Sequence, residues 1–390
     1  MSLYFSKVRL TNWRNFKSAE IDLTERLFLV GPNAAGKSNF LEVFRFLRDL
    51  VSDGGGLAAA VRNRHGIARL RSLFARRDPD VGIRVEVSDS ALNVPVWRYE
   101  IRFRSAAKDK PVRVSKESAE MFANGEWVGR LDRPDGKDIA DAPRLDQAAI
   151  SQTTANESFR PVADFFRSVS YLHLVPQLVR EGTIAPPSTI GADAYGRDLL
   201  ERIRSTAART RTARLGRIEK LVQIAVPALQ NLELHEDAQG RPHLRAKFEH
   251  WRPQGGFQDE SQFSDGTLRL IGLLWALQEP GGPLLLEEPE LSLHSSLVSK
   301  LAPFIARAQE RSRGRQVLVS THSADLLSDP SIGPNEVALI QPAKEGSLLV
   351  LGADDREIAR AMSAGLSAAE TVMPRVAPRQ TRLFDEVSIG

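Results

Sequence analysis

The sequence has no cysteine, which excludes disulfide bonds, thiolate metal sites and cysteine nucleophiles. It also has no run of about 18 apolar residues, the minimum for a membrane-spanning helix. Its start, Met1-Ser2-Leu3-Tyr4-Phe5, is not a signal peptide, because it has no basic segment followed by an apolar stretch. These absences lead us to expect a cytoplasmic protein without a membrane partner.

The composition indicates a folded and slightly basic protein. Its 390 residues suffice for one elaborate domain or two ordinary ones, and a hydrophobic content of 42% supports a substantial core. The net charge of +4 is compatible with a nucleic-acid partner but does not require one. Two stretches concentrate arginine: Arg62, Arg64, Arg69, Arg71, Arg76 and Arg77, and Arg197, Arg202, Arg204, Arg209, Arg211, Arg214 and Arg217. Each stretch is either a solvated surface or a contact for a phosphate backbone, and both interpretations stay open.

One stretch fits the phosphate-binding pattern G-x-x-x-x-G-K-[ST]. An apolar run at residues 27–30 precedes it, and Phe40, Phe44 and Leu47 follow at helical spacing. A strand, a glycine loop and a helix N-terminus in this order hold phosphate oxygens with backbone N–H groups. The predicted nucleotide-binding residues are Gly31, Pro32, Asn33, Ala34, Ala35, Gly36, Lys37, Ser38 and the adjacent Asn39. We expect Lys37 to reach the β- and γ-phosphates and Ser38 to bind Mg²⁺.

A second apolar strand, at residues 283–286, ends in the carboxylates Glu287, Glu288 and Glu290. The first acid after such a strand usually binds Mg²⁺, and the second is placed to orient and deprotonate an attacking water. We therefore assign Glu287 to the metal and Glu288 to the catalytic base. An acidic loop without function is the alternative, but the phosphate-binding loop upstream argues against it.

A third apolar strand, at residues 315–319, ends in the polar cluster Ser320-Thr321-His322-Ser323. Because ligands of α/β proteins bind at the carboxyl ends of strands, we expect His322 to contact the γ-phosphate or the water as a catalytic residue. Between the phosphate-binding loop and the strand that ends in the three glutamates, Ser264-Asp265 fits a helix N-cap followed by a buried helix. Alone, that cap predicts no function.

The rest of the chain is predicted in less detail. Strands are expected at residues 3–10, 19–23, 81–87, 96–104, 111–114 and 242–250, with loop at 123–146. Residues 147–235 are mainly helical in pattern, with helices at 193–209 and 212–231 and a break from Gly182 to Gly191. Strands at 335–341 and 347–352 and a helix near 355–370 come before a loose tail. No sustained heptads indicate a long coiled coil.

The motifs, taken in order, resemble the Walker A, signature, Walker B and switch histidine of ABC-type ATPases. They are most similar to the RecF/SMC/OLD-like branch, of the AAA_21 type, and the start Val8-Arg9-Leu10-Thr11-Asn12-Trp13-Arg14-Asn15-Phe16 resembles that of RecF-like and SMC proteins. The resemblance spans about residues 3–345. It implies an α/β P-loop NTPase head with a mixed core sheet, flanking helices, an antiparallel β lobe and an inserted helical lobe.

The resemblance also implies a head-to-tail homodimer with two ATP molecules between the protomers. Ser264 and Gly266 of one subunit would contact the γ-phosphate held by Lys37 of the other, and Arg14 and Asn15 would join the nucleotide contacts. The signature departs from that of transporters, because Asp265 and Thr267 replace a glycine and a glutamine.

Two further residues are carried over from the family pattern. Gln152 is the candidate for the Q-loop glutamine that binds Mg²⁺, with Gln147 and Gln177 as rivals. His294 falls at the D-loop position, for which the resemblance implies a place at the dimer interface.

We expect an ATPase head at residues 1–345 and a C-terminal extension at 346–390. The head would consist of a β lobe with the phosphate-binding loop (1–146), an inserted, mainly helical lobe (147–250) and a part with the signature, the Walker B acids and the switch histidine (251–345). No coiled-coil arm, cysteine hook or TOPRIM domain is evident. The leading hypothesis is an ATPase that dimerises on ATP, in a dimer or higher oligomer, and controls a separately encoded effector such as a TOPRIM-like nuclease in bacterial defence. The alternatives are a RecF-like clamp on duplex DNA, a scaffold that does not hydrolyse ATP and, least favoured, a transporter subunit.

Overall fold

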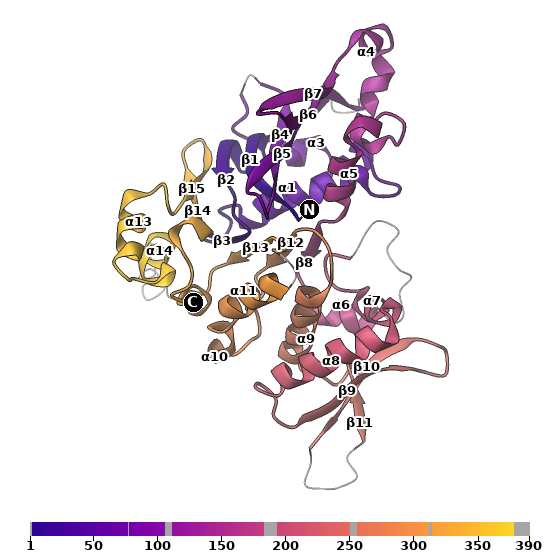
Figure 1. The fold of residues 1–390 in the computed structure, drawn as a ribbon, viewed down its shortest axis with the longest axis vertical. Helices are drawn as coiled ribbons and strands as arrows, with labels where there is room; N and C mark the ends of the chain where they lie inside the picture. Colours follow the sequence, from indigo (N-terminus) through magenta and orange to yellow (C-terminus); the bar gives the residue numbers. More distant parts are fainter. Residues whose placement is uncertain are drawn as a thin grey trace, which may run out of the picture.

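A six-stranded sheet forms the centre of the molecule in the computed structural model, which describes residues 2–76, 78–105, 111–182, 193–249, 256–311 and 314–377 (Figure 1). Its strand order is β15-β14-β3-β13-β12-β8. All neighbouring pairs are parallel except the β14–β15 hairpin. The strands are β3 (Arg26–Val30), β8 (Ser170–Leu172), β12 (Leu284–Glu287), β13 (Val317–Thr321), β14 (Val337–Ala343) and β15 (Gly346–Leu351).

Alternating side chains of this core sheet face two separate hydrophobic cores. In β3, Leu27 and Leu29 belong to one core, whereas Phe28 and Val30 belong to the other. The same alternation divides β12, β13 and β14. Burial on both faces is typical of parallel sheets and explains why these strands are continuous apolar runs in the sequence.

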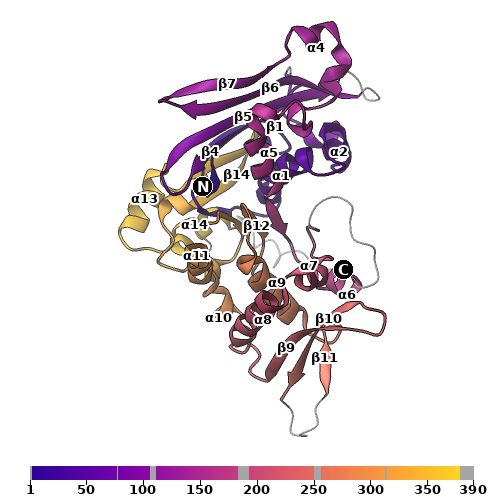
Figure 2. The ribbon, with the colours of Figure 1, turned by 45° about the vertical axis from the view of Figure 1, so that its right-hand side comes forward.

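A second six-stranded sheet, fully antiparallel, packs over the first core. Its order is β2-β1-β4-β5-β6-β7, and Figure 2 shows it at the top of the molecule. The helix α1 (Lys37–Val51) contributes Phe40, Phe44 and Leu47 to this core, and the rings of Phe5 and Phe44 lie 4.7 Å apart. The strands are β1 (Leu3–Trp13), β2 (Phe16–Asp22), β4 (Val81–Asp89), β5 (Val94–Ser105), β6 (Val112–Ala123) and β7 (Glu126–Arg133).

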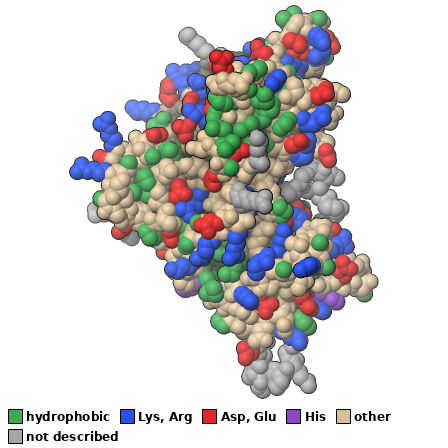
Figure 3. Space-filling view, viewed as in Figure 1, with side chains coloured by type: hydrophobic (Ala, Val, Ile, Leu, Met, Phe, Trp, Pro, Cys, Tyr) green, Lys and Arg blue, Asp and Glu red, His purple; other side chains and the backbone are tan. Residues whose placement is uncertain are grey.

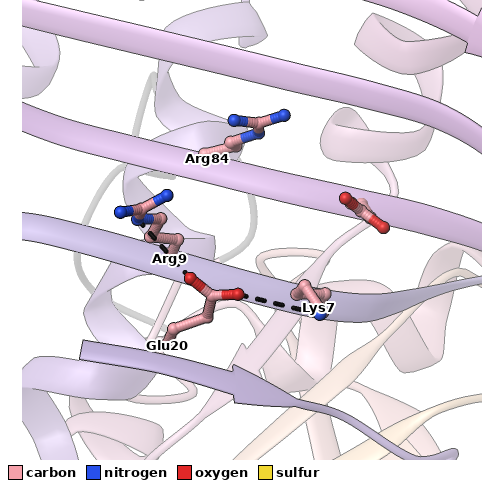
Figure 4. Close-up of a pocket in the computed structure, with 5 residues that line it drawn as sticks. Lys7, Arg9, Glu20 and Arg84 are labelled. Atoms are coloured by element: carbon pink, nitrogen blue, oxygen red, sulfur yellow. Dashed lines mark ion pairs between the residues drawn. The ribbon is translucent and has the colours of Figure 1, made fainter. Parts of the chain in front are cut away.

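The outer face of the antiparallel sheet carries charged side chains of both signs. Figure 4 shows Lys7, Arg9, Glu20 and Arg84 around a shallow hollow, with Glu20 paired to Lys7 at 3.7 Å and to Arg9 at 3.5 Å. Exposed ion pairs of this kind each contribute about 0–1 kcal/mol to stability. This face therefore keeps the sheet solvated and adds little to its stability.

The second core lies on the other face of the core sheet, against helices and a small lobe. The lobe contains α6 (Pro176–Glu181), α7 (Leu199–Ser205), α8 (Ala208–Val222) and the sheet β11-β10-β9, with β9 at Leu229–Glu236, β10 at Pro242–Phe248 and β11 at Phe257–Asp259. The helix α9 (Asp265–Gln278) connects this lobe to the core sheet.

The remaining helices are α2 (Leu57–Arg62), α3 (Ile67–Leu70), α4 (Gly136–Ala140), α5 (Arg160–Arg167), α10 (Ser295–Val298), α11 (Leu301–Arg311), α12 (Ala324–Leu327), α13 (Arg356–Ser363) and α14 (Ala368–Val376). The 3-10 helices are η1 (Ala142–Asp146), η2 (Ala149–Ser151), η3 (Glu157–Phe159) and η4 (Pro334–Glu336).

Several sequence expectations are wrong in detail. Residues 147–235 contain more helix than strand, as expected, but the helix expected at 212–231 ends at Val222, and β9 begins at Leu229 after Pro227. The loop expected at 123–146 contains β7, α4 and η1. Most of the break predicted from Gly182 to Gly191 lies outside the described residues.

The C-terminal boundary expected at residue 345 falls inside the β14–β15 hairpin. The single helix expected near 355–370 is two helices, α13 and α14, and Val372 and Val376 of α14 are buried in the second core. The residues up to 377 are thus part of the head, and the tail predicted to be loose lies largely outside the described residues. Within the described ranges, no helix is long and apolar enough to span a membrane.

Candidate functional site

The phosphate-binding loop joins the end of β3 to the start of α1. Gly36 has a φ of +116°, and Ala34 has a φ of 62°, so the loop depends on left-handed backbone at two positions. The Lys37 side chain is folded back over the loop, where its Nζ donates to the carbonyl oxygens of Gly31 at 2.8 Å and Pro32 at 3.4 Å. Burial lowers the pKa of Lys37, against the opposing charges of three nearby carboxylates. An arriving phosphate group would replace those two carbonyl contacts.

The expected metal-binding residues Ser38 and Glu287 are in contact. The Ser38 hydroxyl donates to Oε1 of Glu287, and the Tyr171 hydroxyl, from the edge strand β8, donates to Oε2. Burial raises the pKa of Glu287, and the neighbouring Glu288 charge acts in the same direction. A hydroxyl and a carboxylate are oxygen donors of the kind that Mg²⁺ takes together with substrate phosphates, so these residues fit that ion.

No described group of three or more His, Cys, Asp or Glu side chains is placed to hold a metal by itself.

Glu288 and His322 meet at the carboxyl ends of the neighbouring parallel strands β12 and β13. Nδ1 of His322 lies 3.2 Å from Oε1 of Glu288, and the Glu288 N–H donates to the Ser320 carbonyl at 2.9 Å. Glu288 has a φ of 44°, so it leaves the strand at a sharp turn. The register of the two strands, with Glu287 opposite Ser320, brings Glu288, the expected base, next to His322.

Glu290 holds the backbone next to His322 by hydrogen bonds, a role that we did not assign from the sequence. Its Oε1 accepts from the Thr321 hydroxyl at 2.5 Å and from the His322 N–H at 3.2 Å. Burial raises the pKa of Glu290, which is 8% exposed. Its second oxygen has no hydrogen-bond partner among the described residues. The sequence shows Glu290 as the third glutamate at the end of β12, but its contacts with Thr321 and His322 follow only from the pairing of β12 with β13.

The turn between β1 and β2 lies directly on the phosphate-binding loop, as expected for Arg14 and Asn15. Asn15 Nδ2 donates to the Ala34 carbonyl at 3.1 Å, and Arg14 Nη1 donates to Asn39 Oδ1 at 3.1 Å. A Cβ at Gly36 would lie 3.3 Å from Asn15 Cβ, so this glycine allows the turn to approach the loop. The Arg14 Nε is buried without a hydrogen-bond partner among the described residues.

The signature residues begin α9, as predicted. The Ser264 hydroxyl accepts from the Thr267 N–H at 3.2 Å and thus caps the helix. Asp265 is held by Arg180 at 2.8 Å and by Gln177 at 3.1 Å. Within the described part of the chain, neither Ser264 nor Gly266 forms a hydrogen bond with the phosphate-binding loop of the same subunit.

The D-loop residue His294 caps the short helix α10 by accepting from the Ser296 N–H at 3.2 Å, and its side chain is exposed. Gly266 of the signature approaches the same segment, because a Cβ there would lie 2.5 Å from the Ser292 carbonyl oxygen. The signature and the D-loop therefore lie against each other within one subunit.

The structure does not bring Gln152 to the metal-binding residues. Its neighbour Ser151 lies 3.9 Å from a Cβ built on Gly56, just beyond the C-terminus of α1. Ser38 is at the other end of this 15-residue helix, which is about 22 Å long. Of the two rival glutamines, Gln177 binds Asp265, and the Gln147 carbonyl accepts from Arg133. This placement argues against the role expected for Gln152.

The strand β8 instead places Tyr171 and His173 beside Glu287. Nδ1 of His173 lies 3.3 Å from the Glu287 carbonyl oxygen. The sequence signal for this strand is a short apolar run followed by histidine, which is too weak to find without the sheet order.

Comparison with known proteins identifies the family. The AAA_21 family model, described as "AAA domain, putative AbiEii toxin, Type IV TA system", matches residues 27–329. A crystal structure of the SmcHead bound to the C-winged helix domain of ScpA is 16% identical, with a TM-score of 0.54, and covers 89% of this chain and 97% of its own. An Smc head domain with an extended coiled coil from Pyrococcus furiosus, bound to the C-terminal domain of ScpA, is 12% identical, with a TM-score of 0.49, and covers 89% and 96%. No curated protein matches. The expected P-loop NTPase head fold is confirmed.

Proposed function

The chain belongs to the AAA_21 family of P-loop ATPases, and on this premise we propose that it binds ATP with Mg²⁺ and hydrolyses ATP to ADP and phosphate. One observation carries the proposal. Lys37, Ser38, Glu287, Glu288 and His322, predicted from three separate motifs, converge at one edge of the core sheet. Ligands of α/β proteins bind at this edge.

Each residue has a distinct role in the proposed reaction. Lys37 binds the β- and γ-phosphate oxygens, and Ser38 and Glu287 hold Mg²⁺, which supplies charge neutralisation on the phosphates. Glu288 accepts a proton from the water that attacks the γ-phosphorus, while the bond from that phosphorus to the bridging oxygen of ADP breaks. His322, in contact with Glu288, orients the base and the water.

We further propose that ATP joins two copies of the chain head to tail. Ser264 and Gly266 would bind the γ-phosphate that the partner holds, because an exposed helix N-terminus favours anions. Ser264 and Gly266 lie at the N-terminus of α9, and this position supports the role.

The dimer would control a separate effector in the cytoplasm, with a nuclease of the TOPRIM-like kind as the leading candidate, in bacterial defence. Support comes from the family description, "AAA domain, putative AbiEii toxin, Type IV TA system".

A RecF-like clamp on duplex DNA is the second candidate. It is favoured by the arginines of α8, of which Arg209, Arg211 and Arg214 would contact the phosphate backbone. DNA affinity should then fall steeply with salt concentration and weaken when all three are changed to alanine.

Turnover and light scattering test the proposal. We expect Glu288→Gln to keep ATP binding, to lose hydrolysis by about 100-fold or more, and to double in mass with ATP and Mg²⁺. Lys37→Ala should neither bind ATP nor dimerise, whereas the exposed Lys137→Ala should match the wild type. Absence of ATP binding by the wild-type protein would refute the function, and wild-type turnover by Glu288→Gln would refute the assigned base.

A further inference from the structure

A basic groove lies at the end of α9 opposite the signature residues. It has a volume of about 860 Å³ and is lined by α8, the C-terminal end of α9, and α11. Five cations line it: Arg214, Arg217, Lys220, Arg307 and Arg311. Figure 3 shows Lys and Arg side chains gathered around a small apolar patch over this part of the surface. We call this feature the α8–α11 groove.

The cations of the groove are not neutralised by acidic side chains. Within the described ranges, none of the five forms an ion pair: Arg217 donates to Gln278 at 2.8 Å, and Arg214 lies over the Trp275 ring at 5.4 Å. The carboxylate in the lining, Glu279, instead accepts from Trp275 at 2.7 Å and faces Arg202 at 3.5 Å. Most other arginines of the lobe have carboxylate partners, so the α8–α11 groove is a local excess of positive charge that a negatively charged ligand would stabilise.

The floor of the groove is apolar. Leu221, Leu277, Phe304 and Ala308 contribute to the lining, between the 15-residue helix α8 and the 11-residue helix α11. A phosphate backbone has no apolar side that would occupy such a floor. An amphipathic helix fits both features, because its apolar face fills a groove between two helices while acidic residues along its edges meet the rim.

We propose that the α8–α11 groove docks an acidic amphipathic helix of a partner protein. The proposal deepens the proposed control of a separate effector and rests on it for the partner's role. Apolar residues at i, i+3, i+4 and i+7 of the helix would cover the partly buried Leu221 and Phe304, and glutamates or aspartates would pair with Arg307 and Arg311. The charge complementarity sets the orientation, and the apolar contacts supply most of the affinity.

A designed peptide provides the probe, because it carries only the proposed chemistry. It is a fluorescein-labelled helix of about 18 residues, long enough to follow α8, with leucine at helical spacing and glutamate along the flanks. Its fluorescence anisotropy is measured with the full chain. The comparison peptide has the same composition with the leucines scattered, so that it keeps the charge but has no apolar face.

We expect the amphipathic peptide to bind the wild-type protein and the scattered peptide to bind about tenfold less tightly or worse, since only the former fills the floor. Arg307→Glu with Arg311→Glu should weaken binding at least about tenfold, and Phe304→Asp should do the same. The matched double variant Arg62→Glu with Arg69→Glu, at exposed arginines of α2 and α3, should bind like the wild type.

Three outcomes would overturn the proposal. The first is equal binding of both peptides, and the second is no binding of either peptide. The third is that the protein binds duplex DNA but not the amphipathic peptide, and that the groove variants abolish the DNA binding. ATP turnover of the Arg307→Glu, Arg311→Glu variant separates this test from the function. If the wild-type protein hydrolyses ATP but does not bind the amphipathic peptide, only the docking proposal is refuted. If the wild-type protein does not hydrolyse ATP, the proposed ATPase function is refuted.

Discussion

The imidazole Nδ1 of His322 lies 3.2 Å from Oε1 of Glu288, although 34 residues of chain separate them. The contact joins the proposed base to the segment that follows the next parallel strand. Glu288 has left-handed backbone, at φ 44°, where it leaves the strand. Loss of the imidazole should therefore affect the chemical step more than the binding of ATP.

We predict that His322→Ala lowers kcat by about 100-fold, near the lower end of the effect of a group that acts in proton transfer. The affinity for ATP should change little, because Lys37 and the loop backbone are intact. Steady-state turnover together with equilibrium nucleotide binding measures both. His235→Ala, at an exposed histidine of β9, is the control. A kcat equal to that of the wild type would remove His322 from the mechanism.

Gly266 should be sensitive to a single added methyl group. The Cβ of an alanine there would lie 2.5 Å from the Ser292 carbonyl oxygen, so the D-loop or the start of α9 must shift. We predict that Gly266→Ala keeps the fold but weakens ATP-dependent dimerisation about tenfold, as seen by light scattering over a range of protein concentrations.

Gly216→Ala is the matched control for Gly266, since nothing lies within 4 Å of its added Cβ in the middle of α8. It should dimerise normally and gain about 0.5–1 kcal/mol of stability. If both alanine variants dimerise like the wild type, the signature and the D-loop do not depend on this close approach.

Arg133 should be essential to the stability of the β lobe. Its guanidinium is 6% exposed and donates to Asp138 at 2.8 Å and to Glu117 at 3.3 Å, and both carboxylates are fully buried. Arg133→Met would leave buried Glu117 without a cation and Asp138 with only the half-exposed Arg144, which should lower the free energy of unfolding by about 3–5 kcal/mol. Urea denaturation measures the loss.

Arg144 contacts the same Asp138 at 3.1 Å, but its side chain is 44% exposed. Arg144→Met should therefore cost no more than about 1 kcal/mol in the same denaturation experiment. Equal losses for the two arginine variants would show that burial is not what makes Arg133 important.

His243 should make stability depend on pH near neutrality. Burial favours a lower pKa for His243, but Glu260 at 2.8 Å and Asp237 at 3.4 Å outweigh it and raise the pKa above 6.5. Burial also raises the pKa of Glu260. In both cases the folded state binds protons more tightly than the unfolded state, so the free energy of unfolding falls as pH rises through the folded pKa values.

The contribution of His243 is thus fully present below its unfolded pKa of about 6.5 and is lost above its raised folded pKa. We predict that His243→Gln lowers the free energy of unfolding more at about pH 6 than at about pH 8.5, with each value compared with the wild type at the same pH. An equal loss at both pH values would contradict the assigned sign.

The sequence predicted the parts of the site that depend on local patterns. The phosphate-binding loop has a fixed spacing, and the strand β3 before it is apolar because both faces are buried. The helix α9 was found from the Ser264 cap. What these elements share is that their sequence signal comes from residues adjacent in the chain.

The parts that the sequence missed depend on distant residues. The strand β7 has mostly exposed side chains, and it forms because β6 offers a free edge in register with it. The strand β8 has three residues, and Tyr171 and His173 reach Glu287 only because β8 pairs with β12. Sheet order, which no local pattern encodes, decided these contacts and separated Gln152 from the metal-binding residues.

The helix α9 has a defined contact at each end. Ser264 caps its start, and the Arg315 guanidinium donates to the carbonyls of Ala276 at 2.9 Å and Glu279 at 2.8 Å near its end, beside the α8–α11 groove. Its 14 residues span about 21 Å of buried, rigid structure. Thermodynamic linkage then requires reciprocity: if a docked helix favours dimerisation by some factor, dimerisation must tighten docking by the same factor. Such a protein would both report its nucleotide state to its partner and sense whether the partner is present.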